Sequence, residues 1–427
     1  SSGEPGTRIS SAMSEALAAV QSHLPETNGD AAGKQEGENV SDDAAGHGSA
    51  ADIPKGETQV GKESSDQSQT SSELPKTADP EEETGRTEGD GQSVEGGNAQ
   101  PVAPLTLESM ELLTGQMQQV AEEARHSVVT VIGITQDLDW FNETYENQGQ
   151  LSGLIVSGGG KEYFILTEYR VVKDVDRIMV TFFNGDTVDA RYVRRDDATG
   201  LAVLRVMAED INRKTREEIR VAGISWVRPV RQGQLVLAIG SPMGYSDAIT
   251  WGIVTSVNNS ITVTDNVYKV ITTNMQGGED GSGVLLDMEG QVIGIMAQKL
   301  TDTKGLGLVS CLPVTELQSL VERLCANEEL VYAGVSGQEV VASISEKTGI
   351  PKGVWVDKVE TDSPAMQAGI QKGDVIFKVD DTDISTLRDF HIALEQGGVG
   401  KKVKISAMRQ SVEGYVEIVF DVTIDAV

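Results

Sequence analysis

The pattern of hydrophobic and polar positions divides the chain into three stretches. Residues 1–104 contain few apolar side chains, with one short stretch of helical spacing at Ile9–Leu24. In residues 105–327, short β-branched runs are separated by Gly, Asn and Asp, which is typical of a barrel or sandwich of many short strands. Residues 328–427 combine strand-like runs with two short helical patterns, which is typical of a small α+β domain.

The spacing of apolar residues predicts individual elements in the second and third stretches. Helical spacing predicts helices at Leu107–Ala124 and Pro313–Cys325. The strands predicted in the second stretch are Ser127–Gly133, Leu151–Val156, Tyr163–Thr167, Arg177–Phe183, Leu201–Val206, Leu235–Ile239, Gly252–Val257, Ser260–Thr264, Val267–Thr273, Gly283–Asp287 and Val292–Met296. In the third stretch we expect strands at Tyr332–Val335, Val354–Val359, Val375–Val379, Val403–Met408 and Val416–Val422, and helices at Ser363–Ala368 and Thr386–Gln396.

The first stretch, residues 1–104, carries a large excess of acidic residues. The chain has 427 residues and a formal net charge of −31, and residues 1–104 hold about 20 acidic but only about 6 basic residues. Such a segment buries too little apolar surface to offset the entropy of ordering, so we predict a disordered acidic spacer or stalk. The charge also excludes a nucleic-acid-coating role, because phosphate binding needs clustered Lys and Arg.

The sequence gives no support for a cofactor or a metal, and we expect neither. Cys311 and Cys325 are too few for a disulfide framework, and no Cys/His cluster has metal-ligand spacing. The Gly-rich runs lack the Lys-Ser/Thr of a phosphate-binding loop. No stretch approaches the ~18 apolar residues of a membrane span. The chain begins at Ser1 rather than Met, so removal of an N-terminal segment, either a signal peptide or a membrane anchor, stays open.

A series of motifs follows residue 150 in a fixed order. They are Gly240-Ser241-Pro242-Met243-Gly244, Trp251-Gly252-Ile253-Val254, Leu285-Leu286-Asp287, and Ser363-Pro364-Ala365 followed by Ala368-Gly369. In their order and spacing they resemble the HtrA/Deg family of PDZ-containing serine proteases, over about 320 residues. The resemblance implies a mainly β protein, with a chymotrypsin-like double β-barrel in residues 105–327 and an α+β PDZ domain in residues 328–427.

The resemblance also implies positions for a Ser-His-Asp triad, and this sequence departs from the family at all three. In that chemistry a histidine takes the serine proton and an aspartate fixes the histidine tautomer. The positions of histidine, aspartate and nucleophile hold Arg170, Gly200 and Gly281. A guanidinium stays protonated near neutral pH and cannot act as a general base. We therefore expect no catalytic residues at the family positions.

Neighbouring residues are poor substitutes for the triad. Ser282 follows the nucleophile position and is kept as a fallback nucleophile, with Lys299 as a conceivable base. Asp197 lies three residues before the aspartate position and is interpreted as a turn carboxylate. No histidine lies between residues 127 and 390. The sequence thus favours a protein that is not an enzyme, while a diverged endopeptidase using Ser282 stays open.

Without a triad, binding surfaces are the remaining functional parts. A PDZ domain adds an extended peptide to a sheet edge and holds its C-terminal carboxylate in a backbone nest. By resemblance, the nest lies at Tyr332-Ala333-Gly334-Val335, and the helix with Leu387, His391 and Leu394 forms the opposite wall. Arg170 in the former cleft is either an anion-binding residue for an acidic peptide or an ordinary ion-pair partner.

We therefore predict an HtrA-like pseudoprotease that acts as a peptide-binding, sensing or scaffold module for peptides or protein C-termini. A chaperone-like quality-control role is a further alternative, because the family also binds unfolded chains. The resemblance implies an extracytoplasmic protein, at the cell surface or anchored to a bacterial membrane. Whether the helix Leu107–Ala124 forms a homo-oligomer or packs on its own barrel stays open.

Overall fold

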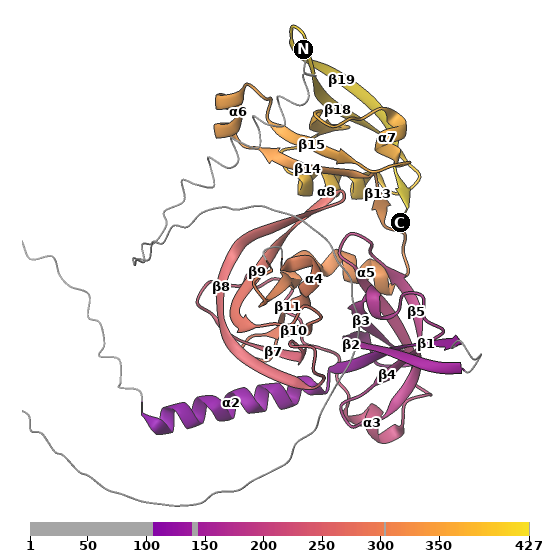
Figure 1. The fold of residues 1–427 in the computed structure, drawn as a ribbon, viewed down its shortest axis with the longest axis vertical. Helices are drawn as coiled ribbons and strands as arrows, with labels where there is room; N and C mark the ends of the chain where they lie inside the picture. The colour runs from indigo at the N-terminus through magenta and orange to yellow at the C-terminus, as the bar shows by residue number, and fades with distance from the viewer. Residues whose placement is uncertain (1–105, 139–143, 303–304, 427) are drawn as a thin grey trace, which may run out of the picture. The chain divides into compact units, whose positions relative to one another are not determined.

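The computed structural model describes residues 106–138, 144–302 and 305–426, and Leu105–Val427 belong to one structural unit (Figure 1). The acidic spacer expected at residues 1–104 lies outside the described residues. Two closed six-stranded barrels are followed by a smaller sheet domain. The expected mainly β fold, a double β-barrel followed by a PDZ domain, is therefore confirmed.

Each barrel is closed by antiparallel pairing of six strands. The first barrel has the order β1-β2-β3-β6-β5-β4 and the second has the order β10-β11-β12-β9-β8-β7. The strands of the first are β1 (Val128–Leu138), β2 (Thr144–Gly158), β3 (Glu162–Glu168), β4 (Arg177–Thr181), β5 (Thr187–Arg195) and β6 (Leu201–Met207). Those of the second are β7 (Leu235–Ser241), β8 (Ala248–Val263), β9 (Asn266–Gln276), β10 (Ser282–Leu286), β11 (Val292–Ala297) and β12 (Leu308–Pro313).

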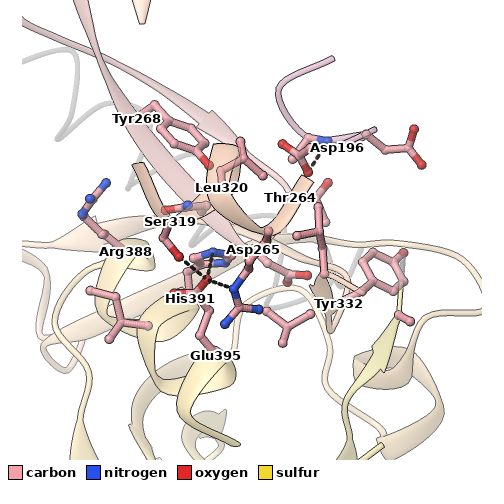
Figure 2. Close-up of a pocket in the computed structure, with 18 of the residues that line it drawn as sticks. Asp196, Thr264, Asp265, Tyr268, Ser319, Leu320, Tyr332, Arg388, His391 and Glu395 are labelled. Carbon is pink, nitrogen blue, oxygen red and sulfur yellow. Dashed lines mark hydrogen bonds and ion pairs between the residues drawn. The ribbon is translucent and has the colours of Figure 1, made fainter. Parts of the chain in front are cut away.

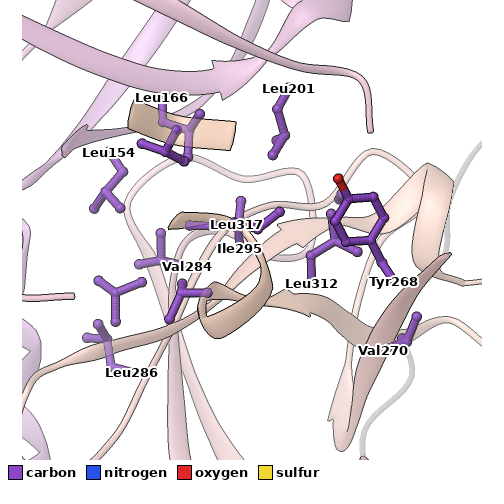
Figure 3. Close-up of a cluster of buried hydrophobic side chains, with 14 of the residues drawn as sticks. Leu154, Leu166, Leu201, Tyr268, Val270, Val284, Leu286, Ile295, Leu312 and Leu317 are labelled. Carbon is purple, nitrogen blue, oxygen red and sulfur yellow. The ribbon is translucent and has the colours of Figure 1, made fainter. Parts of the chain in front are cut away.

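One apolar cluster draws side chains from both barrels (Figure 3). Leu154 and Leu166 come from the first barrel, and Val284, Leu286 and Ile295 come from the second. Removing such surface from water stabilises a fold by about 25 cal/mol per Å². The cluster therefore holds β2 and β3 against β10, which is the region where the fallback nucleophile Ser282 lies.

Helix α2 (Leu107–Arg125) packs on the barrels, and several shorter helices connect their strands. Helix α2 begins after Thr106, whose hydroxyl caps the Ser109 N–H, and it buries Met117 and Ala121 against the shared cluster. The N-terminal turns of α2 leave Leu107 and Leu112 exposed. The shorter helices are η1 (Tyr169–Val171), α3 (Arg213–Glu218), α4 (Gln298–Thr301), η2 (Val314–Glu316) and α5 (Gln318–Cys325).

The C-terminal domain is a sheet of order β14-β15-β16-β18-β19, with β17 paired to β16 and a separate β13–β20 pair. Its strands are β13 (Val331–Tyr332), β14 (Val335–Val340), β15 (Gly353–Val359), β16 (Val375–Val379), β17 (Thr382–Asp383), β18 (Lys402–Ser411), β19 (Gly414–Thr423) and β20 (Asp425–Ala426). Its helices are α6 (Ala342–Thr348), α7 (Pro364–Ala368) and α8 (Leu387–Gly397). Strand β14 is the last strand of this sheet, so one edge of it is open to further pairing.

Candidate functional site

The Arg170 guanidinium is paired with two carboxylates, Glu168 of the first barrel and Asp280 of the second, at the position of the former cleft expected from the resemblance. Arg170 lies in η1 directly after β3, where its Nε and Nη2 donate to the two carboxylate oxygens of Glu168 at 2.9 and 3.2 Å. Its Nη1 donates to Asp280 Oδ1 at 3.1 Å. Burial raises the pKa of Glu168, and the hydrogen bond from Arg170 opposes that rise. Of the two interpretations of Arg170, this arrangement matches the ion-pair partner rather than a free anion site.

The loop at Gly281 has no space for a side chain. The Gly278 N–H donates to the Pro242 carbonyl oxygen at 2.8 Å, and the Gly281 N–H donates to the Gly278 carbonyl oxygen at 2.9 Å. A Cβ atom on Gly281 would lie 2.3 Å from the Pro242 oxygen and 2.9 Å from the Gly278 oxygen. Real Cβ atoms do not approach backbone oxygens this closely, so a serine at this position requires the loop to move.

Ser282 begins β10 and is buried, with only 1% of its surface exposed. Its Oγ accepts a hydrogen bond from the Ser152 N–H at 2.9 Å. Lys299, the conceivable base, pairs with Asp280 at 2.9 Å, which lowers the pKa of the Asp280 carboxyl. The structure therefore places the Ser282 hydroxyl against a backbone amide, below the surface that a peptide would reach.

The other triad positions hold no acid or base either. Gly200 has a φ of +72°, in the left-handed region that favours glycine, and it turns the chain into β6. Asp197 forms an exposed ion pair with Arg195 at 2.6 Å. The histidines within the described ranges are His126, whose ring lies 4.2 Å from that of Phe183, and His391 on α8. The region around Ser282 therefore lacks an imidazole among the residues that the structure describes.

Three of the four residues expected to form the PDZ nest, Ala333, Gly334 and Val335, donate their N–H groups to a side chain from the second barrel; these three N–H groups are called the nest below. The N–H groups of Ala333 and Gly334 donate to Asp265 Oδ2 at 2.7 and 2.9 Å, and the N–H of Val335 donates to Asp265 Oδ1 at 2.7 Å. Asp265 lies in the turn between β8 and β9, with a φ of +61°. Burial raises the pKa of this carboxyl to about 6, against the opposing effect of the three N–H groups. Sequence reasoning missed Asp265, because a turn aspartate gives no sign of a partner about 70 residues away.

A cavity of about 580 Å³ lies beside the nest, between the second barrel and α8 (Figure 2). Tyr332 and His391 line it, together with Arg388, Ile392 and Glu395 of α8. Leu387 and Leu394 are not among its lining residues. They are buried in the core of the C-terminal domain, with 3% and 0% of their surfaces exposed. Of the expected helix-wall residues, only His391 therefore lines the cavity. Burial lowers the pKa of His391.

No group of three or more His, Cys, Asp or Glu residues among residues 106–138, 144–302 and 305–426 could hold a metal ion. Of the helices that the structure describes, none is long and apolar enough to cross a membrane.

Comparisons with known proteins match both parts of the fold. A model described as a trypsin-like peptidase domain matches residues 151–295, and a PDZ domain model matches residues 293–419. The chain is 29% identical over 311 residues to the serine protease Do-like HtrB of Bacillus subtilis (strain 168), covering 66% of each chain. It is 29% identical over 270 residues to a probable periplasmic serine endoprotease DegP-like of Pseudomonas fulva (strain 12-X), covering 62% of this chain and 54% of that protein. The chain thus matches about half to two thirds of the length of these relatives.

Solved structures of similar fold include HtrA-type proteases. The HtrA-type protease AlgW with decapeptide matches with a TM-score of 0.54 and 22% identity, covering 73% of this chain and 98% of that chain. A serine endoprotease from Yersinia pestis matches with a TM-score of 0.50 and 25% identity, covering 73% and 97%. The domain models, the sequence relatives and the fold agree. The chain therefore belongs to the HtrA family of trypsin-like, PDZ-containing proteins.

Proposed function

We propose that this protein is a catalytically inactive HtrA-type protein that binds peptides or protein C-termini through its PDZ domain. The observation that supports this most directly is the environment of Ser282. Its hydroxyl is buried and is bonded to the Ser152 N–H, where an active nucleophile needs a proton acceptor and access to a substrate carbonyl. Losing triad members typically costs about 10⁶ in rate, which leaves too little activity for a useful peptidase.

The cleft around Arg170 supports the same conclusion. Arg170, Glu168 and Asp280 form ion pairs, and Lys299 joins them through Asp280. Every cationic group in this network already has a carboxylate partner, so none is free to activate a hydroxyl. In the proposed function the cleft contributes stability, and binding is the task of the PDZ domain.

A fluorophosphonate probe tests the proposal, because it reacts covalently only with an activated serine. We expect no mass increase on the intact protein under conditions that label an active serine protease completely, and no hydrolysis of unfolded casein. Ser282→Ala is the matched variant. Stoichiometric labelling of the natural chain that disappears in Ser282→Ala would overturn the proposal and favour the diverged endopeptidase.

Binding is tested separately with a display library of peptides with free C-termini. A preference for particular terminal residues is expected of a PDZ reader. Equal retention of unrelated unfolded chains, without a preference at the terminus, would instead favour the chaperone-like alternative.

The proposal places the protein outside the cytoplasm of a bacterium. Its relatives from Pseudomonas are named periplasmic, which supports that location. Membrane attachment and self-association through the exposed Leu107 and Leu112 on α2 stay expectations. Cell fractionation and sedimentation of the full chain would test them.

A further inference from the structure

Asp265 makes two kinds of contact with the PDZ nest. Its carboxylate accepts from the N–H groups of Ala333, Gly334 and Val335, and its own backbone N–H donates to the Val335 carbonyl oxygen at 2.7 Å. Successive N–H groups that converge on one point form a concave anion site. A nest of this kind holds the terminal carboxylate of a bound peptide.

The nest is followed directly by an edge strand to which a peptide could add. Val335 is the first residue of β14, which pairs with β15 on one side and is the end strand of its sheet. A peptide that adds to an edge strand alternates N–H donation and carbonyl acceptance with it. Asp265 thus makes the two contacts expected of a terminal residue: its carboxylate lies in the nest, and its amide bonds to the edge strand.

The contact is one that a competitor could replace. Asp265 is only 3% exposed, and its partners in the described part of the chain are backbone N–H groups rather than Lys or Arg. The nearby Glu360 carboxylate repels it. A buried charge without a counter-ion retains a desolvation penalty, so the net gain from this contact is smaller than its hydrogen-bond count suggests.

We propose that Asp265 is an internal ligand of the PDZ nest, and that a peptide with a free terminal carboxylate binds there by displacing the tip of the β8–β9 hairpin. This inference rests on the proposed peptide-binding function. One nest cannot hold two carboxylates, so peptide binding and the Asp265 contact exclude each other. Binding of a peptide therefore releases a segment of the second barrel.

The adjoining cavity indicates the chemistry of the peptide upstream of its terminus. The charged side chains that line it, Asp265 aside, are those of Asp196, Asp197, Glu316, Glu360, Glu395 and Asp425, against Arg323 and Arg388. Of these, Arg388 is paired with Glu316 at 3.4 Å and Arg323 with Glu395 at 3.6 Å. Asp197 and Glu360 also have basic partners, Arg195 and Lys358, which do not line the cavity. The remaining carboxylates, those of Asp196 and Asp425, fit a peptide that carries Lys or Arg upstream of its terminal carboxylate.

Two substitutions weaken or remove the internal ligand and keep the turn: Asp265→Asn keeps one accepting oxygen and loses the charge, and Asp265→Gly removes the side chain. Asp265→Asn suits the φ of +61° and replaces one carboxylate oxygen by an amide that cannot accept from the nest. Asp265→Gly deletes the side chain at the same φ. Asp174→Asn is the matched control, because Asp174 also lies at positive φ (53°) in a barrel turn but is exposed. Thermal unfolding of all four proteins checks that they are folded.

The experiment measures binding of fluorescent decapeptides of randomised sequence by anisotropy, with free or amidated C-termini, to the full chain. We expect the free-carboxylate pool to bind both Asp265 variants roughly tenfold more tightly than the natural chain and Asp174→Asn, because the binding-competent fraction rises. The amidated pool should show no such gain. Equal affinity of the free-carboxylate pool for all four proteins would overturn the internal-ligand inference and leave peptide binding standing. Absence of binding to all four would overturn the proposed function itself, and the inference with it.

Hydrogen exchange gives a second readout on the natural chain. The Asp265 amide is bonded to Val335 in the closed arrangement, so saturating free-carboxylate peptide should increase its exchange while the nest amides stay protected. Unchanged exchange at Asp265 in the presence of bound peptide would contradict displacement.

Discussion

Gly281, at the position that the resemblance assigns to the nucleophile, leaves no room for a side chain. A Cβ atom there would meet the Pro242 carbonyl oxygen, which is itself bonded to the Gly278 N–H. A hydroxymethyl group there meets backbone atoms rather than flexible side chains. The loop must therefore be remodelled before a serine can stand at this point.

We predict that Gly281→Ser destabilises the protein by about 1–3 kcal/mol, as overpacking usually does. The mutant should still fail to react with the fluorophosphonate probe, because no base has been restored. Denaturant unfolding measures the loss of stability. Gly149→Ser is the matched control, since Gly149 is exposed and a Cβ there meets nothing within 4 Å. Equal stability of the two mutants would contradict the steric argument.

Asp265 predicts a defined pH dependence. Its pKa is raised to about 6 in the folded protein, whereas an aspartate in an unfolded chain titrates near about 4. Folding therefore takes up a proton between these values, and the folded state gains stability as the pH falls from 7 to 5, by about 1 kcal/mol. Asp265→Asn should lack this contribution, which denaturant unfolding at the two pH values measures.

Other ionisable groups near Asp265 do not alter the comparison, because they are present in both proteins. Tyr332 and Glu360 face Asp265 directly. The remaining charged or titratable side chains of the cavity are Asp196, Asp197, Glu316, Tyr268, Arg323, Arg388, His391, Glu395 and Asp425. Identical pH dependence in the natural chain and in Asp265→Asn would show that the carboxyl is not buried as described.

At the scale of elements, α8 depends on its N-terminal cap. The Thr386 hydroxyl accepts from the Asp389 N–H at 3.1 Å, and the Asp389 carboxylate accepts from the Thr386 N–H at 2.9 Å. These two bonds satisfy amide groups that the first turn of a helix leaves without partners. The cap therefore holds the start of the helix whose outer face lines the cavity.

We predict that Thr386→Ala lowers the stability of the protein by about 1 kcal/mol. Thr386→Ser, which keeps the hydroxyl, should lose much less. Thermal unfolding of the two mutants under the same conditions measures the difference. If both mutants lost the same stability, the methyl group rather than the cap would be responsible.

Most elements followed from local pattern, and the exceptions have physical reasons. The helix expected at Leu107–Ala124 is α2, and the strands expected at Gly252–Val257 and Ser260–Thr264 form the single long strand β8. The polar residues between those two runs suggested a break. Strand β5 was not predicted, because four of the nine residues in its sequence, TVDARYVRR, are charged and only one is buried. Pairing with β4 and β6 holds it in place.

At the scale of the whole molecule, the contacts that join distant segments could not be predicted. The nest at Tyr332–Val335 and the assignment of Arg170, Gly200 and Gly281 to the triad positions stay predictions of the sequence. It gave no indication that Asp265 fills the nest, that Asp280 pairs with Arg170, or that Leu387 faces inward. These are tertiary contacts, and neither periodicity nor a short motif contains information about them.

The charge of the whole chain also predicts how binding depends on salt. With a net charge of −31 and a carboxylate-rich cavity, the protein should prefer peptides that carry Lys or Arg upstream of the terminus. Raising NaCl from 50 to 500 mM should weaken binding of such a peptide by roughly threefold to tenfold, because salt screens the attraction. Titration calorimetry of a Lys-containing peptide and its Gln-substituted counterpart measures this. Equal salt dependence for the two peptides would contradict it.

The close approach of the Pro242 carbonyl oxygen to Gly281 also has a consequence for the evolution of this sequence. If the proposed inactivity holds, gaining hydrolysis would require separate replacements at Arg170, Gly200 and Gly281, and a side chain at Gly281 would displace main-chain atoms. A replacement at one position alone would supply no triad. Under that proposal, selection would act on the partners that the protein binds rather than on turnover.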